Sequence, residues 1–159
     1  MRKYFTGGLV ILWMTVIFAF SAQTAQESSQ ISQSTAYRIA KWQNRFREQE
    51  KSEKELEEQA EKMQFVIRKG AHMSEYALLA ILLILHLGCY GYSRKRILLL
   101  AWGGAVCYAA SDEFHQLFVP GRAGRWTDVC IDSLGALAGV MFTEVLRRFV
   151  QRKRKKQAE

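Results

Sequence analysis

Hydrophobic residues gather in four long runs along the chain of 159 residues, and polar stretches separate them. The runs cover approximately residues 4–22, 70–90, 97–119 and 127–146. Each is close to the ~20 residues that an α-helix needs to cross a hydrocarbon layer about 30 Å thick. The pattern therefore predicts an all-α protein, a four-helix transmembrane bundle that forms a single domain over residues 1–159.

Two of the runs are less regular than the others. The fourth is interrupted by Asp128, Asp132 and Glu144, which makes it the weakest of the four. The first follows Arg2 and Lys3, as the apolar part of a signal peptide would. It is longer than such segments usually are, and a poor cleavage site follows it, so we expect an uncleaved membrane anchor.

Residues 23–69 form a polar loop between the first two runs. Its opening stretch, AQTAQESSQISQST, predicts a flexible link with a helix cap at its end. Apolar residues such as Trp42 and Phe46 then recur at helical spacing, and charged residues follow, with Glu50 and Lys54 four apart. We expect one amphipathic, charged helix, which either lies on the outer leaflet or is a solvated face without a binding role.

Basic residues predict the orientation of the chain, whose formal net charge is +8. Arg2 precedes the first run, residues 94–96 are all basic, and RRFVQRKRKK in the tail, residues 147–159, has seven basic residues and no acid. Positive residues near the ends of spans mark the cytoplasmic side, so we expect both termini in the cytoplasm and residues 23–69 outside. A membrane flank explains this tail, so we expect the lipid bilayer as a partner and no nucleic acid.

The cysteines carry no recognisable chemistry. Cys89, Cys107 and Cys130 lie in or beside apolar runs at irregular spacing. An odd number without a CxxC motif argues against a disulfide framework and against a zinc site. We expect all three to be small apolar packing residues.

Three of the predicted spans carry polar residues near their outer ends, in the stretches RKGAHMSEY, SDEFHQ and TDVCID. At 1.5 Å per residue, these residues lie within roughly 10 Å of the outer boundary. In each span they recur three and four residues apart, so they share one stripe of the helix. The stripes are Lys69, His72 and Tyr76 in the second span, Asp112, His115 and Gln116 in the third, and Asp128, Asp132, Gly135 and Gly139 in the fourth.

Ionisable side chains inside a membrane are costly unless they face protein, water or a partner. Three polar stripes at one depth therefore favour an arrangement in which they face one another and form a pocket open to the outside. The GxxxG motif at Gly135 and Gly139 is consistent with close helix packing, although the motif alone is a weak signal.

These motifs together resemble the VanZ-like family of bacterial membrane proteins. The resemblance covers nearly the whole chain. Its residues lie in KGAHMSEY at 69–76, SDEFHQ at 111–116, PGR at 120–122, the pair Gly135 and Gly139 with Asp128 before it, and an FxFSxQ pattern at 18–23. Asp132 departs from the family pattern, where asparagine is expected, and adds a charge to the pocket. The resemblance implies a role at the cell envelope, in the bacterial cell membrane, and the family is named for a protein associated with teicoplanin resistance.

Three hypotheses for the pocket follow. In the first, it binds or modifies a surface lipid or a lipid-linked cell-wall precursor, with Lys69, Arg122 and Arg125 near an anionic headgroup. His72, Asp112 and Glu113 would then orient donors or move protons as candidate catalytic residues. The remaining candidate binding residues are Glu75, Tyr76, His115, Gln116, Asp128 and Asp132.

In the second hypothesis the protein is a metal-assisted membrane enzyme, because its histidines and carboxylates offer suitable ligands, although their spacing matches no specific metal motif. In the third, ion pairs such as Lys69–Asp128 or Arg122–Glu113 only lock the helices together. A transporter would need more spans or a dimer. The sequence assigns no cofactor, no metal site and no oligomeric state.

Overall fold

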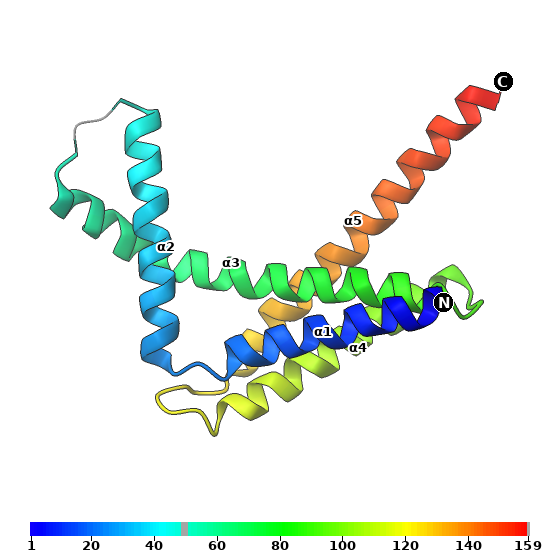
Figure 1. Cartoon of the computed structure of the whole chain (residues 1–159), viewed down its shortest axis with the longest axis horizontal. Helices are drawn as coiled ribbons and strands as arrows, with labels where there is room; N and C mark the ends of the chain where they lie inside the picture. The colour runs from blue at the N-terminus through cyan, green and yellow to red at the C-terminus, as the bar shows by residue number, and fades with distance from the viewer. Residues whose placement is uncertain (49–50, 159) are drawn as a thin grey trace.

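A computed structural model describes residues 1–48 and 51–158, with the side chains up to residue 157. Within these residues the chain forms five α-helices (Figure 1): α1 (Arg2–Ser21), α2 (Ala25–Phe46), α3 (Glu53–Leu87), α4 (Arg94–Gln116) and α5 (Trp126–Ala158). By length and composition, α1, α3, α4 and α5 could each cross a membrane. The predicted all-α class and the four apolar spans are thus confirmed, but the arrangement of the spans differs from the prediction.

Helix α3 is the centre of the structure and packs against each of the other helices. Helices α1 and α4 and the C-terminal half of α3 run roughly side by side, while α5 crosses them obliquely (Figure 1). The N-terminus and the C-terminus both lie toward the right of this view. The core between the helices contains Val10, Ile17, Tyr76, Leu79, Ala80, Ile84, Ile97, Ala101, Ala105, Ala109, Ala136 and Val140.

The loop between the first two spans contains two helices where we predicted one. Thr24 forms a capping box with Glu27, so α2 begins where the flexible link was expected, and that prediction is wrong. A second capping box, Ser52 with Glu55, begins α3. Hydrogen bonds then hold α2 on α3, including one from Gln59 to Gln43 at 3.0 Å. We call α2 together with residues 53–69 the headpiece. The predicted Glu50–Lys54 pair lies outside the described residues.

Two spans belong to longer helices than the hydrophobic runs suggested. The second span is the C-terminal part of α3, a helix of 35 residues that also supplies half of the headpiece. The basic tail continues α5 as far as Ala158 instead of following it as a separate segment. The fourth span is also not the weakest, since the apolar window of α5 is more hydrophobic than that of α4. Its acids lie near the ends of that window, where they interrupt it less.

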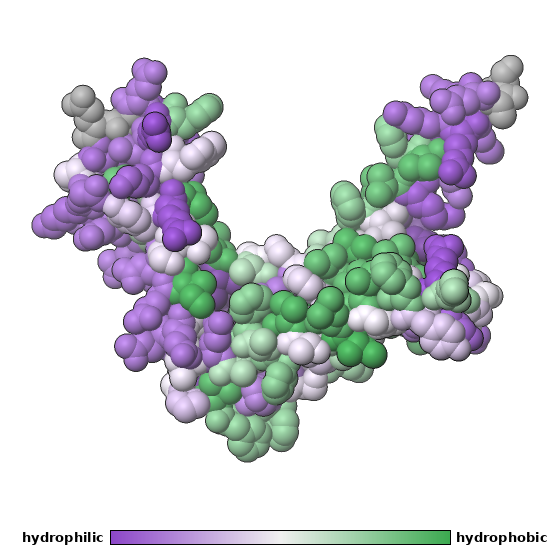
Figure 2. All heavy atoms as spheres, in the orientation of Figure 1, coloured by the Kyte–Doolittle hydropathy of each residue, from purple (hydrophilic) through white to green (hydrophobic). Residues whose placement is uncertain are grey.

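The surface divides into apolar and polar regions that match this arrangement. Figure 2 shows hydrophobic side chains over α1, α4 and the C-terminal half of α3, and hydrophilic ones over the headpiece and the end of α5. Large apolar side chains such as Phe5, Leu12, Leu99 and Phe142 are exposed on the spans. Side chains of this kind at the surface of apolar helices are suited to contact with lipid.

Candidate functional site

The polar residues that end α4 lie on its buried face. Buried alanines, which include Ala105 and Ala109, recur four residues apart along this face, and Glu113 continues the row. The exposed fraction is 4% for Asp112, 6% for Glu113 and 4% for Gln116. Acids can follow the apolar run of α4 without a break because they point into the bundle and not into lipid.

The crossing of α5 over α3 brings two more polar residues to the same place. Gly135 and Gly139 of α5 lie so close to α3 that a Cβ atom on either would be 2.3 Å from a carbonyl oxygen of α3. Tyr76 of α3 lies beside this contact and is fully buried, and Asp132 of α5 is only 2% exposed. Asp132 is near enough to Asp112 for the two charges to interact. Residues from all three polar stripes therefore meet inside the bundle.

Buried polar atoms without a hydrogen-bond partner gather around these acids. Each such atom costs about 1–3 kcal/mol, so native proteins contain few of them. We call Glu75, Asp112, Glu113 and Asp132 the buried acid cluster. Within the part of the chain that the structure describes, the unpartnered atoms at or beside the cluster are Ser21 Oγ, Glu75 Oε2, Tyr76 OH, Asp112 Oδ1, His115 Nδ1 and Asp132 Oδ1.

An ion pair joins the middle of α3 to the start of α5. The ammonium group of Lys69 donates to Asp128 at 2.5 Å, and both side chains are partly exposed. This is one of the two pairs that the structural hypothesis predicted. The other, Arg122–Glu113, does not form, because Glu113 accepts a hydrogen bond of 2.8 Å from the backbone N–H of Arg125.

Arg122 ties the loop after α4 to the end of α1. Its guanidinium donates to the carbonyl oxygens of Gln23 at 3.1 Å and Phe20 at 3.4 Å, and to Gln116 Oε1 at 3.4 Å. Gly121 supplies the tight turn with a φ of 73°, which an L residue rarely adopts. Burial lowers the pKa of Arg122, but a guanidinium stays protonated in proteins, so the charge remains.

Two hollows share Arg68, His72 and Arg122 among their lining residues, and we call them together the boundary hollow. The first, about 210 Å³, opens between the end of α1, α2 and α3. The second, about 270 Å³, extends to Lys69, Gln116, Arg125 and Asp128. The lining of the first is Phe20, Gln23, Ser28, Ile31, Ser32, Thr35, Ile67, Arg68, Ala71, His72, Glu75 and Arg122.

Two of the site residues were not predicted from the sequence. Arg68 donates to Ser29 Oγ at 2.6 Å and thereby joins α2 to the hollow. It lies four residues before His72 on one face of α3, a spacing that could have placed it. Ser21, buried at the end of α1 and close to Asp112, belongs to the FxFSxQ pattern that the sequence offered.

The other predicted residues lie at different places around the cluster. His72 Nδ1 is 3.6 Å from Glu75 Oε2, at the wall of the boundary hollow. His115 turns toward α1, where its ring centroid is 4.5 Å from that of Phe18. Arg125 is exposed at the rim.

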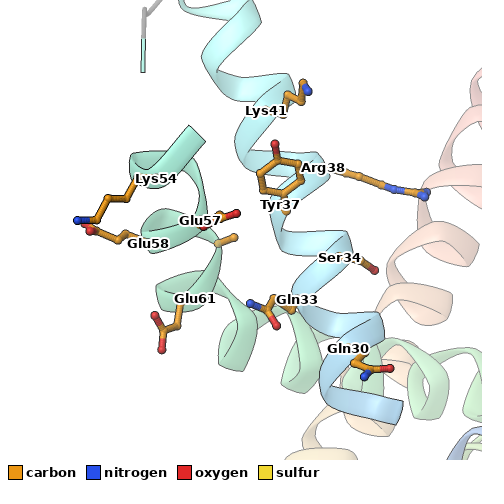
Figure 3. A pocket seen from close by; sticks show the side chains of 11 residues that line it. Gln30, Gln33, Ser34, Tyr37, Arg38, Lys41, Lys54, Glu57, Glu58 and Glu61 are labelled. Atoms are coloured by element: carbon orange, nitrogen blue, oxygen red, sulfur yellow. The ribbon is translucent and has the colours of Figure 1, made fainter. Parts of the chain in front are cut away.

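A larger hollow, about 900 Å³, lies in the headpiece and contains none of the predicted site residues. Figure 3 shows its lining, with Tyr37 and Lys41 on α2 and Glu57 and Glu58 on α3. Tyr37 also donates a hydrogen bond to Glu53 at the start of α3. In residues 1–48 and 51–158, no three His, Cys, Asp or Glu side chains are placed to hold a metal ion together.

The chain matches the family model described as VanZ/LLP1 over residues 7–147. It belongs to the VanZ/LLP1 family. The matched region contains the boundary hollow and the buried acid cluster. Comparisons with curated proteins and with solved structures gave no match. Membership of this family, together with four apolar helices, makes the chain a multi-pass membrane protein whose helices lie in a lipid bilayer.

Proposed function

We propose that this VanZ-family protein binds the anionic headgroup of a surface lipid, or of a lipid-linked cell-wall precursor, in the boundary hollow. One observation carries the proposal: a single hollow combines the cations of Arg68 and Arg122 with the apolar side chains of Phe20, Ile31 and Ile67. A ligand with a charged head and an apolar chain matches such a lining, because each part meets side chains of its own kind.

The cations are suited to a phosphate or carboxylate. Arginine guanidinium groups pair with both through charge-assisted hydrogen bonds. Lys69 lines the neighbouring part of the hollow but is paired with Asp128, so it would contribute mainly through its charge. The buried acid cluster reaches the hollow through Glu75, which lines it beside His72. It would orient donor groups of the ligand or exchange protons with it.

We further propose that the hollow opens to the outside and that both termini are cytoplasmic. The basic residues before α1, before α4 and at the end of α5 support this orientation. The placement of both termini toward the same end of the molecule is in keeping with it (Figure 1). A ligand held in the outer leaflet could then lower susceptibility to a glycopeptide such as teicoplanin.

A purely structural role is the second candidate, and the Lys69–Asp128 pair favours it. Such pairs can join helices without taking part in binding. This role does not explain why Glu75 Oε2 and Asp132 Oδ1 are buried without a hydrogen-bond partner among the described residues, because a cluster that only packed helices would be expected to satisfy them.

The test compares Arg68→Gln with Arg38→Gln, a matched change at an exposed arginine of the headpiece. Native mass spectrometry of the full chain measures retention of phosphatidylglycerol, and teicoplanin susceptibility is measured in a sensitive host at equal membrane abundance. We expect wild type and Arg38→Gln to bind the lipid and raise the inhibitory concentration, and Arg68→Gln to do neither. Equal lipid retention by all three proteins would contradict the proposal.

A second variant addresses the acid cluster. Asp112→Asn removes a charge at the centre of the three polar stripes and keeps the shape of the side chain. We expect it to abolish the susceptibility phenotype without lowering the amount of protein in the membrane. Full activity of this variant at equal abundance would show that Asp112 has no working role.

A further inference from the structure

We infer that the boundary hollow recognises a headgroup that carries a primary ammonium group next to its phosphate, as phosphatidylethanolamine does. This inference rests on the proposed function and narrows the class of ligand. It comes from the acid in the lining, Glu75, which binding of an anion alone leaves unexplained.

Glu75 is an acceptor without a donor. Its Oε2 atom is buried and has no hydrogen-bond partner among the described residues. The imidazole Nδ1 of His72 is 3.6 Å away, which is beyond hydrogen-bond distance. Arg122 lies near enough for its charge to act on Glu75, but its donors are directed to Phe20, Gln23 and Gln116. The carboxylate is therefore open to a donor that a ligand brings.

The charges behind Glu75 favour a cation at this wall. Asp112 is close enough to act on Glu75, and it is itself 4% exposed with an unpartnered Oδ1. A ligand that was only anionic would leave Glu75 without a donor and would bring a further negative charge near the carboxyl groups of Glu75 and Asp112, which is unfavourable in a low dielectric. An ammonium group would instead satisfy Glu75 and reduce the repulsion.

The same hollow provides for the two charges of such a headgroup. All three ionisable residues line the first hollow, where Arg68 and Arg122 would supply positive charge to the phosphate and Glu75 would accept from the ammonium. Gln23, Ser28 and Thr35 also line this space and offer further oxygen acceptors. An ammonium has three N–H donors, whereas a trimethylammonium group has none. The geometry therefore predicts discrimination between ethanolamine and choline headgroups, which carry the same net charge.

The test uses the full chain in nanodiscs and native mass spectrometry, with phosphatidylethanolamine, its mono- and dimethyl derivatives, phosphatidylcholine and phosphatidylglycerol. We expect affinity to fall at each methylation, with phosphatidylethanolamine bound about tenfold more tightly than phosphatidylcholine. Tenfold corresponds to about 1.4 kcal/mol, close to the contribution of one charge-assisted hydrogen bond. Equal affinity across the methylation series would overturn the inference.

Variants distinguish this inference from the proposed function. In Glu75→Gln we expect the ratio of ethanolamine to choline affinity to fall to about one, and in Glu75→Asp part of the preference to return. In Arg68→Gln all the phospholipids should bind more weakly. If Glu75→Gln still prefers ethanolamine to choline headgroups, the inference is overturned but the proposed function stands. If wild type binds the phospholipids no more tightly than uncharged diacylglycerol, the proposed function is overturned as well. If Glu75→Gln does not fold, the methylation series on wild type decides.

The same chemistry could come from a free amine on a wall precursor. Competition against phosphatidylethanolamine by a polyprenyl-linked precursor with a free amine, and by one with the amine acetylated, separates the two sources. Displacement by the free-amine form alone supports the inference with the precursor as ligand. Displacement by neither supports it with the phospholipid as ligand, and equal displacement by both overturns it.

Discussion

Replacing Gly139 with alanine should destabilise the α3–α5 crossing that assembles the buried acid cluster. The new Cβ would lie 2.3 Å from the carbonyl oxygen of Ala77, whereas real Cβ atoms essentially never approach within 3.0 Å. Because the obstructing atom belongs to the backbone, no side-chain rotation relieves the clash, and α5 must move away by about 1 Å. Overpacking of this kind costs about 1–3 kcal/mol.

Two effects must be separated in this experiment. Alanine is a better helix former than glycine by about 0.5–1 kcal/mol, so we expect a net loss of up to about 2.5 kcal/mol. Gly103→Ala in α4 is the matched control, since a Cβ there meets no atom within 4 Å. It should lose no stability, and its helix propensity should even stabilise the protein slightly.

The assay is reversible unfolding of the full chain in mixed micelles, followed by circular dichroism. Headgroup binding should fall together with stability, because Asp132 lies two turns before Gly139 on α5 and depends on the same contact. If Gly139→Ala is as stable as Gly103→Ala, the close crossing does not hold the bundle together, and this account of the site is wrong.

Three further predictions concern the ion pair, the topology and the headpiece. Exchanging the charges of Lys69 and Asp128 in a double variant should restore the membrane abundance that each single reversal lowers; a double variant as depleted as the singles would show that the pair is not structural. In a cysteine-free background, a cysteine within 36–62 should react with an impermeant maleimide on intact cells, and one within 152–156 should not. The reverse pattern would place the boundary hollow on the cytoplasmic side of the membrane. Hydrogen bonds from Ser52 hold the pKa of Glu55 below its ordinary 4.5. The cap at the start of α3 is therefore fully formed above pH 4.5 and is lost as the pH falls through the lower pKa of the folded state. Hydrogen exchange at the start of α3 should rise in acid, and Glu55→Gln should remove this pH dependence.

The spans and the polar stripes could be predicted because they depend on local pattern. Apolar runs of about 20 residues report the spans directly. The stripe of α4 could be predicted because helical periodicity places Asp112 and Gln116 on one face. The departure of α2 from prediction had a local cause too: the composition of AQTAQESSQISQST suggested a link, but Thr24 and Glu27 already carry the spacing of a capping box.

The surroundings of Arg122 could not be predicted in the same way. Two of its three partners are backbone carbonyl oxygens at and just after the end of α1, about a hundred residues earlier in the chain, and a backbone oxygen leaves no trace in the sequence. A backbone hydrogen bond of 3.4 Å, donated by Ala25 N–H to the carbonyl oxygen of Pro120, joins the turn at Gly121 to the start of α2. Arg68 was overlooked for a different reason, since its neighbours in a charged loop concealed that it belongs to the helix that lines the hollow.

Because α3 is long, residues 53–69 of the headpiece and one wall of the boundary hollow are parts of the same helix. Its 35 residues extend about 52 Å, well beyond the thickness of a hydrocarbon layer. Arg68, at the base of the headpiece, and Glu75, in the hollow, are separated by only two turns of this uninterrupted helix. A tilt imposed on the headpiece would therefore act as a lever, and the spacing between the walls of the hollow would change with it.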